Sequence, residues 1–100
     1  MADRVATAAA PLTRSARLTG WGRIAPSTAQ LAEPAGPAQV AALLTEAPAG
    51  RGVIARGLGR SYNNAAQNGG GLVIGTSQLN QIISLDAGTG LAVCEAGVSL

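Results

Sequence analysis

The segment with the greatest capacity for chemistry runs from Ala55 to Ala65 and reads ARGLGRSYNNA. Its glycines, Gly57 and Gly59, let the backbone approach a ligand and present amide N–H groups to it. Arg56 and Arg60 can balance the negative charge of such a ligand. The other polar side chains are short, and they can either donate to phosphate oxygens or close turns on the backbone: Ser61, Asn63 and Asn64. The residues alone leave two interpretations open, a cradle for a pyrophosphate and a tight glycine-rich connection whose arginines face water.

Two familiar phosphate-binding designs do not fit this segment. The dinucleotide fingerprint G-x-G-x-x-G requires a third glycine where Tyr62 stands, a helix after the loop, and an acidic residue about 20 positions further on. Here a coil rich in Gly and Asn follows, and then short β-type segments. The phosphate loop of nucleotide hydrolases requires a lysine, and the chain contains none. A glycine loop between strands, which would hold a dinucleotide through backbone amides, remains.

The absence of whole residue types excludes several kinds of site. The sequence has no His and no Lys, and its single cysteine is Cys94. Zinc sites built from His and Cys, His-based triads, lysine Schiff bases and an internal disulfide are therefore excluded within these residues. We assign no catalytic residue and no metal ligand to the chain.

The two aromatic residues of the chain, Trp21 and Tyr62, have different expected surroundings. For Trp21, packing against a neighbouring sheet is favoured over a place in a ligand pocket. Tyr62 lies in a polar loop that offers little core, so contact with a ligand is as well supported as packing. Cys94 lies in an alternating strand, where we expect a small buried apolar residue, and Asp86 is expected to cap a hairpin turn.

Hydrophobic periodicity and the positions of Gly and Pro divide the chain into short elements. Residues 1–19 lack periodicity and are rich in Ala, Thr and Arg, which predicts a flexible basic arm, with order beginning near Trp21. An edge strand is predicted over residues 27–31. Pro37 suits the first turn of a helix, whose apolar face continues to Ala47. Further strands are predicted over residues 52–56, 72–74, 81–85 and 91–96, with a hairpin connection over 86–90.

The core that these elements can form is thin. Of the 47% of residues that are apolar, 21 are Ala, and Phe is absent. A chain of 100 residues forms one domain at most, and its many Ala side chains bury little area. Ser99 follows the last predicted strand like the N-cap of a helix. We therefore expect an α+β fold, with a small β-sheet and one helix, that is part of a larger, truncated domain.

Charge and hydropathy limit the expected partners. Residues 1–23 carry a net charge of +3 and the remainder −1. Seven arginines with two aromatic residues are poor material for stacking on bases, so no nucleic acid partner is expected. No stretch approaches the roughly 18 apolar residues of a membrane span, and the N-terminal run is too weakly hydrophobic for a signal peptide. The expected location is cytoplasmic or peripheral to a membrane.

Four stretches together resemble one family of flavoproteins. They are RLTGWGRIAPS at residues 17–27, GRGVIARGLGRSY at 50–62, AQNGGGLVI at 66–74 and EAGVSL at 95–100. The combination is similar to the N-terminal part of the vanillyl-alcohol-oxidase, or p-cresol-methylhydroxylase-type, FAD-binding family, and within it to oxidases of polyprenyl-phosphate ribose. The resemblance covers most of residues 17–100 and implies that residues 20–100 form the N-terminal portion of an FAD-binding domain.

The resemblance implies FAD as the cofactor and a loop that wraps its pyrophosphate. The residues of that loop would be Ala55, Arg56, Gly57, Leu58, Gly59, Arg60, Ser61, Tyr62, Asn63, Asn64 and Ala65. Tyr62 and Trp21 would lie near the flavin and in the substrate pocket. The flavin would carry the redox chemistry, which fits the lack of a local acid, base or metal.

The activity implied by the resemblance is that of an FAD-dependent oxidoreductase. Its substrate would be a polyprenyl-phosphate sugar, whose ribose 2-hydroxyl is oxidised as the first half of an epimerisation in arabinan cell-wall biosynthesis. A partner reductase would complete the second half. The competing hypotheses are a truncated remnant that binds no flavin and, from the arginines, a phosphate or nucleic-acid binder.

The sequence departs from the family pattern at three positions. The family usually has Gly-Asp where Asn63 and Asn64 stand, and Asp where Gly75 stands. Asn enters left-handed backbone space more readily than most residues, which favours Asn63 in the place of the glycine.

Overall fold

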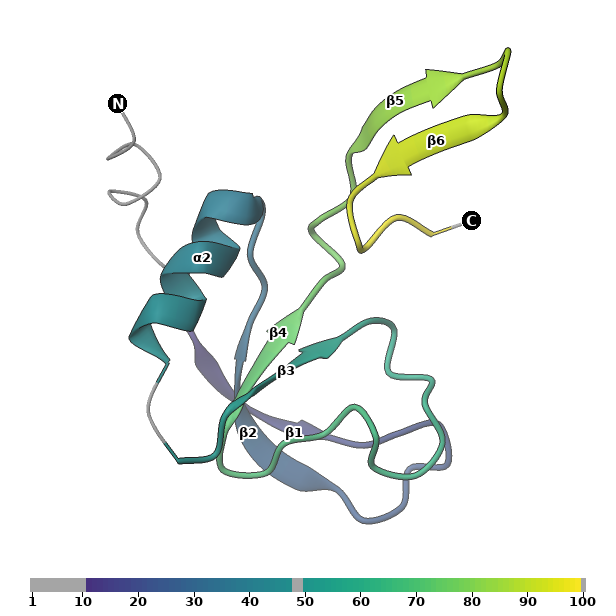
Figure 1. Ribbon diagram of the computed structural model, residues 1–100. Helices are drawn as coiled ribbons and strands as arrows, with labels where there is room; N and C mark the ends of the chain where they lie inside the picture. Colours follow the sequence, from purple (N-terminus) through teal and green to yellow (C-terminus); the bar gives the residue numbers. More distant parts are fainter. Residues whose placement is uncertain (1–10, 48–49, 100) are drawn as a thin grey trace.

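The computed structural model describes residues 11–47 and 50–99, and these form six strands and one helix (Figure 1). In chain order the elements are β1 (Arg14–Leu18), β2 (Ser27–Ala32), α2 (Pro37–Glu46), β3 (Val53–Arg56), β4 (Leu72–Gly75), β5 (Ile82–Asp86) and β6 (Leu91–Cys94). Four strands form one sheet in the order β1-β2-β4-β3, and β5 pairs with β6 in a separate two-stranded sheet. The fold is therefore α+β, with one helix and a small main sheet, as the sequence predicts.

The centre of the four-stranded sheet is β4. Every residue of β4 is buried, because this strand pairs in parallel with β2 on one side and with β3 on the other. Strands of this kind are covered on both faces and are apolar without alternation, as the Leu-Val-Ile run is here. On one face Leu43 of α2 packs with Ala32, Leu72 and Ile74. The opposite face is formed by Ala29, Leu31 and Val73, with Ala16, Leu18 and Ile54 packed against them.

Residues 14–18 form strand β1, so their predicted place in a flexible arm is wrong. β1 pairs with β2 in antiparallel register from Arg14↔Leu31 to Leu18↔Ser27. Within β1, only Ala16 and Leu18 pack against the core. Two apolar residues are too weak a pattern to predict a strand from the sequence without knowledge of its pairing partner. The prediction of an edge strand at β2 is also wrong, because β2 lies between β1 and β4. Residues 1–10 of the predicted arm lie outside the described residues.

Helix α2 forms where the sequence predicts it. Pro37 occupies the first turn, where its missing N–H and fixed φ do no harm. Leu43 is the buried residue of the helix, while Leu44 is 56% exposed. Ala47 leaves the helix in an extended conformation, as expected for a residue that precedes a proline. Among residues 11–47 and 50–99 no helix has the length and apolar character needed to span a membrane.

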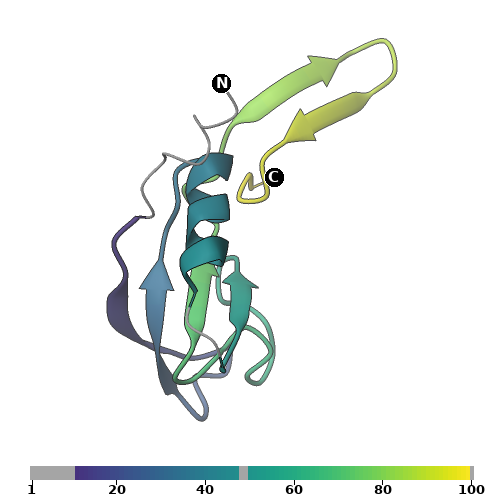
Figure 2. The same cartoon turned by 60° about the vertical axis from the view of Figure 1, so that its left-hand side comes forward.

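The β5–β6 hairpin projects away from the four-stranded sheet, at the far end of the molecule from β1 (Figures 1 and 2). All residues of both strands are exposed. The predicted cap at Asp86 is confirmed, since its Oδ1 accepts hydrogen bonds from the N–H groups of Gly88 at 2.9 Å and Thr89 at 3.4 Å. The predicted burial of Cys94 is wrong, because no part of the described chain covers the hairpin and the thiol is exposed.

Candidate functional site

The glycine loop, residues 57–65, begins where β3 ends and lies at the carboxyl end of the parallel strands β3 and β4. The two strand ends are joined by the N–H of Thr76, which donates to the carbonyl of Arg56 at 3.0 Å. Ligands of parallel sheets bind beyond the carboxyl ends of the strands. Of the predicted cofactor residues, Ala55 and Arg56 belong to β3 and the other nine follow it without interruption.

Gly57 and Gly59 have different structural roles in this loop. Gly59 has φ +71°, a conformation that favours glycine, and a Cβ atom there would displace the guanidinium group of Arg56. Gly57 lies outside the left-handed region, and a Cβ atom at this position would meet nothing within 4 Å. Neither reason applies at Gly57, and its lack of a side chain leaves the backbone open to an external group. This open backbone fits the pyrophosphate of a dinucleotide.

A cavity of about 180 Å³ adjoins this open backbone. It is lined by Gly57 and Leu58 on one side, Thr76 and Ser77 on a second, and residues 96–99 on the third. The third side is held by Gly97, whose N–H donates to the carbonyl of Leu79 at 2.8 Å. None of these eight described residues carries a charged side chain, so an anion here would be held by amide and hydroxyl donors.

Arg56 is used chiefly to hold the loop, which refines its predicted role in balancing ligand charge. Its side chain is half-buried and donates from Nη1 to the carbonyl of Ala66 at 3.0 Å and from Nη2 to the carbonyl of Thr19 at 2.6 Å. These bonds connect the end of β3 to the far end of the loop and to the segment after β1. Arg60, by contrast, is exposed.

Trp21 and Tyr62, the two residues predicted near the substrate, lie together although 41 positions separate them in the sequence. Both line a cavity of about 150 Å³ with Gly22, Ile24 and Asn63. The N–H of Trp21 donates to the carbonyl of Ser61 at 2.9 Å, which places the segment between β1 and β2 beside the glycine loop (Figure 1). Trp21 is 62% exposed and Tyr62 77% exposed. The favoured packing of Trp21 against a sheet is therefore wrong, while the lack of core around Tyr62 is confirmed.

Asn63 adopts φ +59°, the left-handed conformation predicted for it from the sequence. Gly20 is a further residue of the site that the sequence pattern does not single out, and it is buried directly beneath the loop. A Cβ atom at Gly20 would overlap the carbonyl oxygens of Ser61 and Asn63. A glycine immediately before the single Trp is the local signal that could have drawn attention to this close approach.

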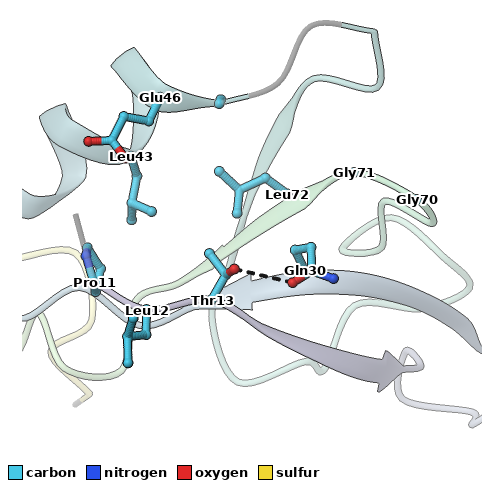
Figure 3. Close-up of a pocket in the computed structure, with 10 residues that line it drawn as sticks. Pro11, Leu12, Thr13, Gln30, Leu43, Glu46, Gly70, Gly71 and Leu72 are labelled. Carbon is cyan, nitrogen blue, oxygen red and sulfur yellow. Dashed lines mark hydrogen bonds between the residues drawn. The ribbon is translucent and has the colours of Figure 1, made fainter.

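Another cavity, of about 520 Å³, lies away from the glycine loop (Figure 3). It opens between the C-terminal part of α2 and the residues that precede β1, and Leu43 and Leu72 face it. Thr13 and Gln30 form its floor, where Oγ1 of Thr13 donates to Oε1 of Gln30 at 3.2 Å. None of the predicted site residues reaches it, so the cavity is an open edge of the core rather than part of the glycine-loop site.

Comparison with known proteins agrees with this geometry. Residues 28–100 match the family described as FAD binding domain, which spans the whole glycine loop and the parallel strands that position it. The decaprenylphosphoryl-beta-D-ribose oxidase of Mycolicibacterium smegmatis is 53% identical over 90 residues, which cover 88% of this chain and 20% of that protein. The chain thus spans about a fifth of that relative's length.

These matches confirm the resemblance, the partial-domain fold and the FAD cofactor expected from the sequence. The shared region includes the open backbone at Gly57, the joined ends of β3 and β4, and the turn that follows β6. The chain belongs to the FAD-binding domain family.

Proposed function

We propose that this chain supplies the pyrophosphate-binding loop of an FAD-dependent oxidoreductase that oxidises a polyprenyl-phosphate sugar. The observation that carries the proposal is the open backbone of Gly57 at the carboxyl ends of β3 and β4. Neither the backbone conformation nor a neighbouring atom requires glycine at position 57. The close approach of a ligand to the backbone explains why a glycine stands there.

The residues of the chain position the cofactor, and bound FAD would supply the hydride acceptor. Backbone N–H groups from Gly57 onward would hold the pyrophosphate oxygens in the cavity that Thr76 and Ser77 also line. The exposed rings of Tyr62 and Trp21 would lie against the flavin or the substrate and restrict their orientation. The hydrogen bonds from Arg56 to Ala66, at the far end of the loop, and to Thr19, in the segment after β1, would keep the amide groups in place before the cofactor arrives.

The substrate and partners of the complete protein are proposed from its relative. The printed name of the Mycolicibacterium smegmatis protein describes an oxidase of decaprenylphosphoryl-beta-D-ribose. A substrate of this class carries a lipid chain and an oxidisable ribose hydroxyl, so the protein would work in the cytoplasm or at the surface of a membrane. A partner reductase would accept the oxidised sugar and complete an epimerisation.

The proposal is tested by exchanging the matching segment of the Mycolicibacterium smegmatis oxidase for residues 11–100 of this chain. This exchange protein is expected to purify with flavin and to oxidise decaprenylphosphoryl-ribose, with flavin reduction followed by absorbance. A folded exchange protein that contains no flavin would contradict the proposed cofactor role. One that binds flavin but leaves it oxidised in the presence of this substrate would contradict the proposed substrate class.

A further inference from the structure

A second cavity adjoins the glycine loop and differs sharply in charge from the cavity at Gly57. Its volume is about 370 Å³, within the usual range of small-molecule sites. Arg23, Arg56 and Arg60 line it together with Trp21 and Gly59, and none of the described acidic residues does. We call it the arginine pocket. Three cations gathered without a carboxylate repel one another, and a bound anion would relieve that repulsion.

The arginine pocket is held in shape by hydrogen bonds that do not involve the apolar core. The carbonyl of Thr19 accepts from Arg56, the N–H of Trp21 donates to Ser61, and Nε2 of Gln67 donates to the carbonyl of Ala25 at 3.0 Å. These three bonds dock the segment between β1 and β2 onto the glycine loop and its continuation. The pocket therefore exists before any ligand arrives.

Arg23 occupies an unusual backbone conformation in this docked segment. Its φ is +57°, which is unfavourable for a residue other than Gly, Asn or Asp. The N–H of Arg23 donates to the carbonyl of Gly20 at 3.2 Å, and this turn helps to hold the conformation. Strained non-glycine residues of this kind gather at ligand sites. In this conformation Arg23 lines the same cavity as Arg56 and Arg60.

The arginine pocket is distinct from the proposed pyrophosphate cavity. Within residues 11–47 and 50–99, only Leu58 lines both cavities. The match to the FAD-binding family begins at residue 28, so Trp21 and Arg23 lie outside the unit that this family shares. Flavoproteins of this family share their cofactor but differ in substrate. A pocket formed partly by residues outside the shared unit is therefore suited to binding a substrate.

We propose that the arginine pocket binds the phosphate group of a phosphorylated sugar substrate, with Arg23 and Arg60 as its main ligands. This inference rests on the proposed function, since the relative acts on a phosphoryl-ribose compound. Guanidinium groups pair with phosphate oxygens through two parallel hydrogen bonds. Arg56 contributes its charge, because its Nη1 and Nη2 atoms already donate to Ala66 and Thr19. Trp21 lies beside the bound group and offers a face to the sugar.

The single Trp of the chain makes this proposal directly measurable, because its fluorescence reports on the arginine pocket. The 100-residue chain is titrated with ribose 5-phosphate, with ribose as the uncharged control and ADP as the pyrophosphate probe. We expect a saturable change of fluorescence with ribose 5-phosphate at about millimolar concentration and none with ribose. The variants are Arg23→Asn, which keeps a residue tolerant of positive φ, and Arg60→Gln.

Each of these variants is expected to weaken ribose 5-phosphate binding about tenfold or more, because the charge-assisted pairing of one guanidinium group with the phosphate is lost. The matched control is Arg14→Gln, which removes an exposed arginine of β1 that does not line the pocket. Circular dichroism of every variant checks that the sheet is retained, and unchanged amide shifts of β4 give a second check.

Three results would overturn the inference. The first is no change of fluorescence up to about 20 mM ribose 5-phosphate, and the second is an equal loss of ribose 5-phosphate affinity in Arg14→Gln. The third is that replacement of Arg23 and Arg60 weakens the binding of ADP but not that of ribose 5-phosphate. The last result would assign the pocket to the flavin pyrophosphate. If the arginine pocket does not bind phosphate, the exchange protein still binds flavin. If the proposed function is wrong, the exchange protein purifies without flavin. The two failures are therefore distinguishable.

Discussion

At the scale of single residues, the glycines around the loop act through different physical causes. Gly59 is required by its positive φ, Gly20 by the backbone above it, and Gly57 by neither. A sequence pattern reports all three as the same letter. Asn63 could be predicted from the sequence because its conformational preference is intrinsic, whereas the anchoring role of Arg56 depends on carbonyl groups 10 and 37 positions away.

Gly20→Ala is expected to detach the segment between β1 and β2 from the glycine loop. The added Cβ atom would overlap two backbone carbonyl oxygens, which cannot move without disturbing the loop. The expected loss of unfolding free energy is about 1 to 3 kcal/mol, measured by denaturant titration. Gly22→Ala is the matched control, since its Cβ atom would make only an ordinary contact with the Ile24 side chain at 3.7 Å. Equal free energies of unfolding for the two variants would show that the close contact of Gly20 with the loop carbonyl groups does not contribute to stability.

Tyr62→Ala is expected to affect flavin chemistry more than folding. The ring is 77% exposed, so its removal should change the free energy of unfolding by less than about 0.5 kcal/mol. In the exchange protein the flavin absorbance maximum or the turnover number should change, because the ring would no longer restrict the flavin or substrate. A large fall in melting temperature with normal flavin behaviour would instead assign Tyr62 a structural role.

At the scale of elements, the local sequence was sufficient to predict the elements that depend on local sequence alone. Pro37 and the apolar spacing after it were enough for α2, and the Asp-Ala-Gly-Thr-Gly run was enough for the hairpin connection. Strand β1 and the interior position of β2 were predicted wrongly because both depend on pairing between separate segments. Burial of Cys94 failed for a related reason, since strand alternation says nothing of whether a covering layer is present. The contiguous loop could be predicted from its residue types, whereas only the family resemblance placed Trp21 beside Tyr62.

The turn of the β5–β6 hairpin is expected to loosen in acid. The N–H of Gly88 and then the side chain and N–H of Thr89 stabilise the Asp86 carboxylate, and they hold its pKa below the ordinary value of 3.8. Because the folded pKa is lowered, the cap stabilises the turn above the unfolded pKa and is lost as the pH falls through the folded pKa. The amide shift of Gly88, followed from about pH 6 to pH 2, should show a midpoint below 3.8. Asp86→Asn should abolish this transition, and a midpoint above 3.8 would contradict the account.

At the scale of the whole molecule, the described residues leave much apolar surface uncovered. Ile82, Leu85 and Leu91 of the hairpin are each more than 60% exposed, and Leu58 of the loop is 66% exposed. An isolated two-stranded hairpin is marginally stable in water. The chain also spans about a fifth of its relative, and FAD is far larger than the 180 Å³ cavity at Gly57.

The 100 residues alone are therefore expected not to retain FAD. Two or three backbone contacts, each worth about 1 kcal/mol net, would have to offset the ordering of a glycine-rich loop at about 1 to 2 kcal/mol per residue. Titration of the purified chain with FAD should show no saturable quenching of flavin fluorescence at micromolar concentration. Saturable binding in that range would mean that these residues form a self-sufficient flavin module.

The most direct test of the flavin-loop assignment is the ratio of FAD to protein in two variants of the exchange protein. Gly57→Ala and Gly36→Ala each add a Cβ atom that meets nothing within 4 Å, and neither glycine has a positive φ. Only Gly57 lies on the proposed pyrophosphate site. We predict that Gly36→Ala retains its flavin and that Gly57→Ala binds FAD about tenfold more weakly or worse. Equal flavin content in the two variants would contradict the assignment of the glycine loop to the FAD pyrophosphate.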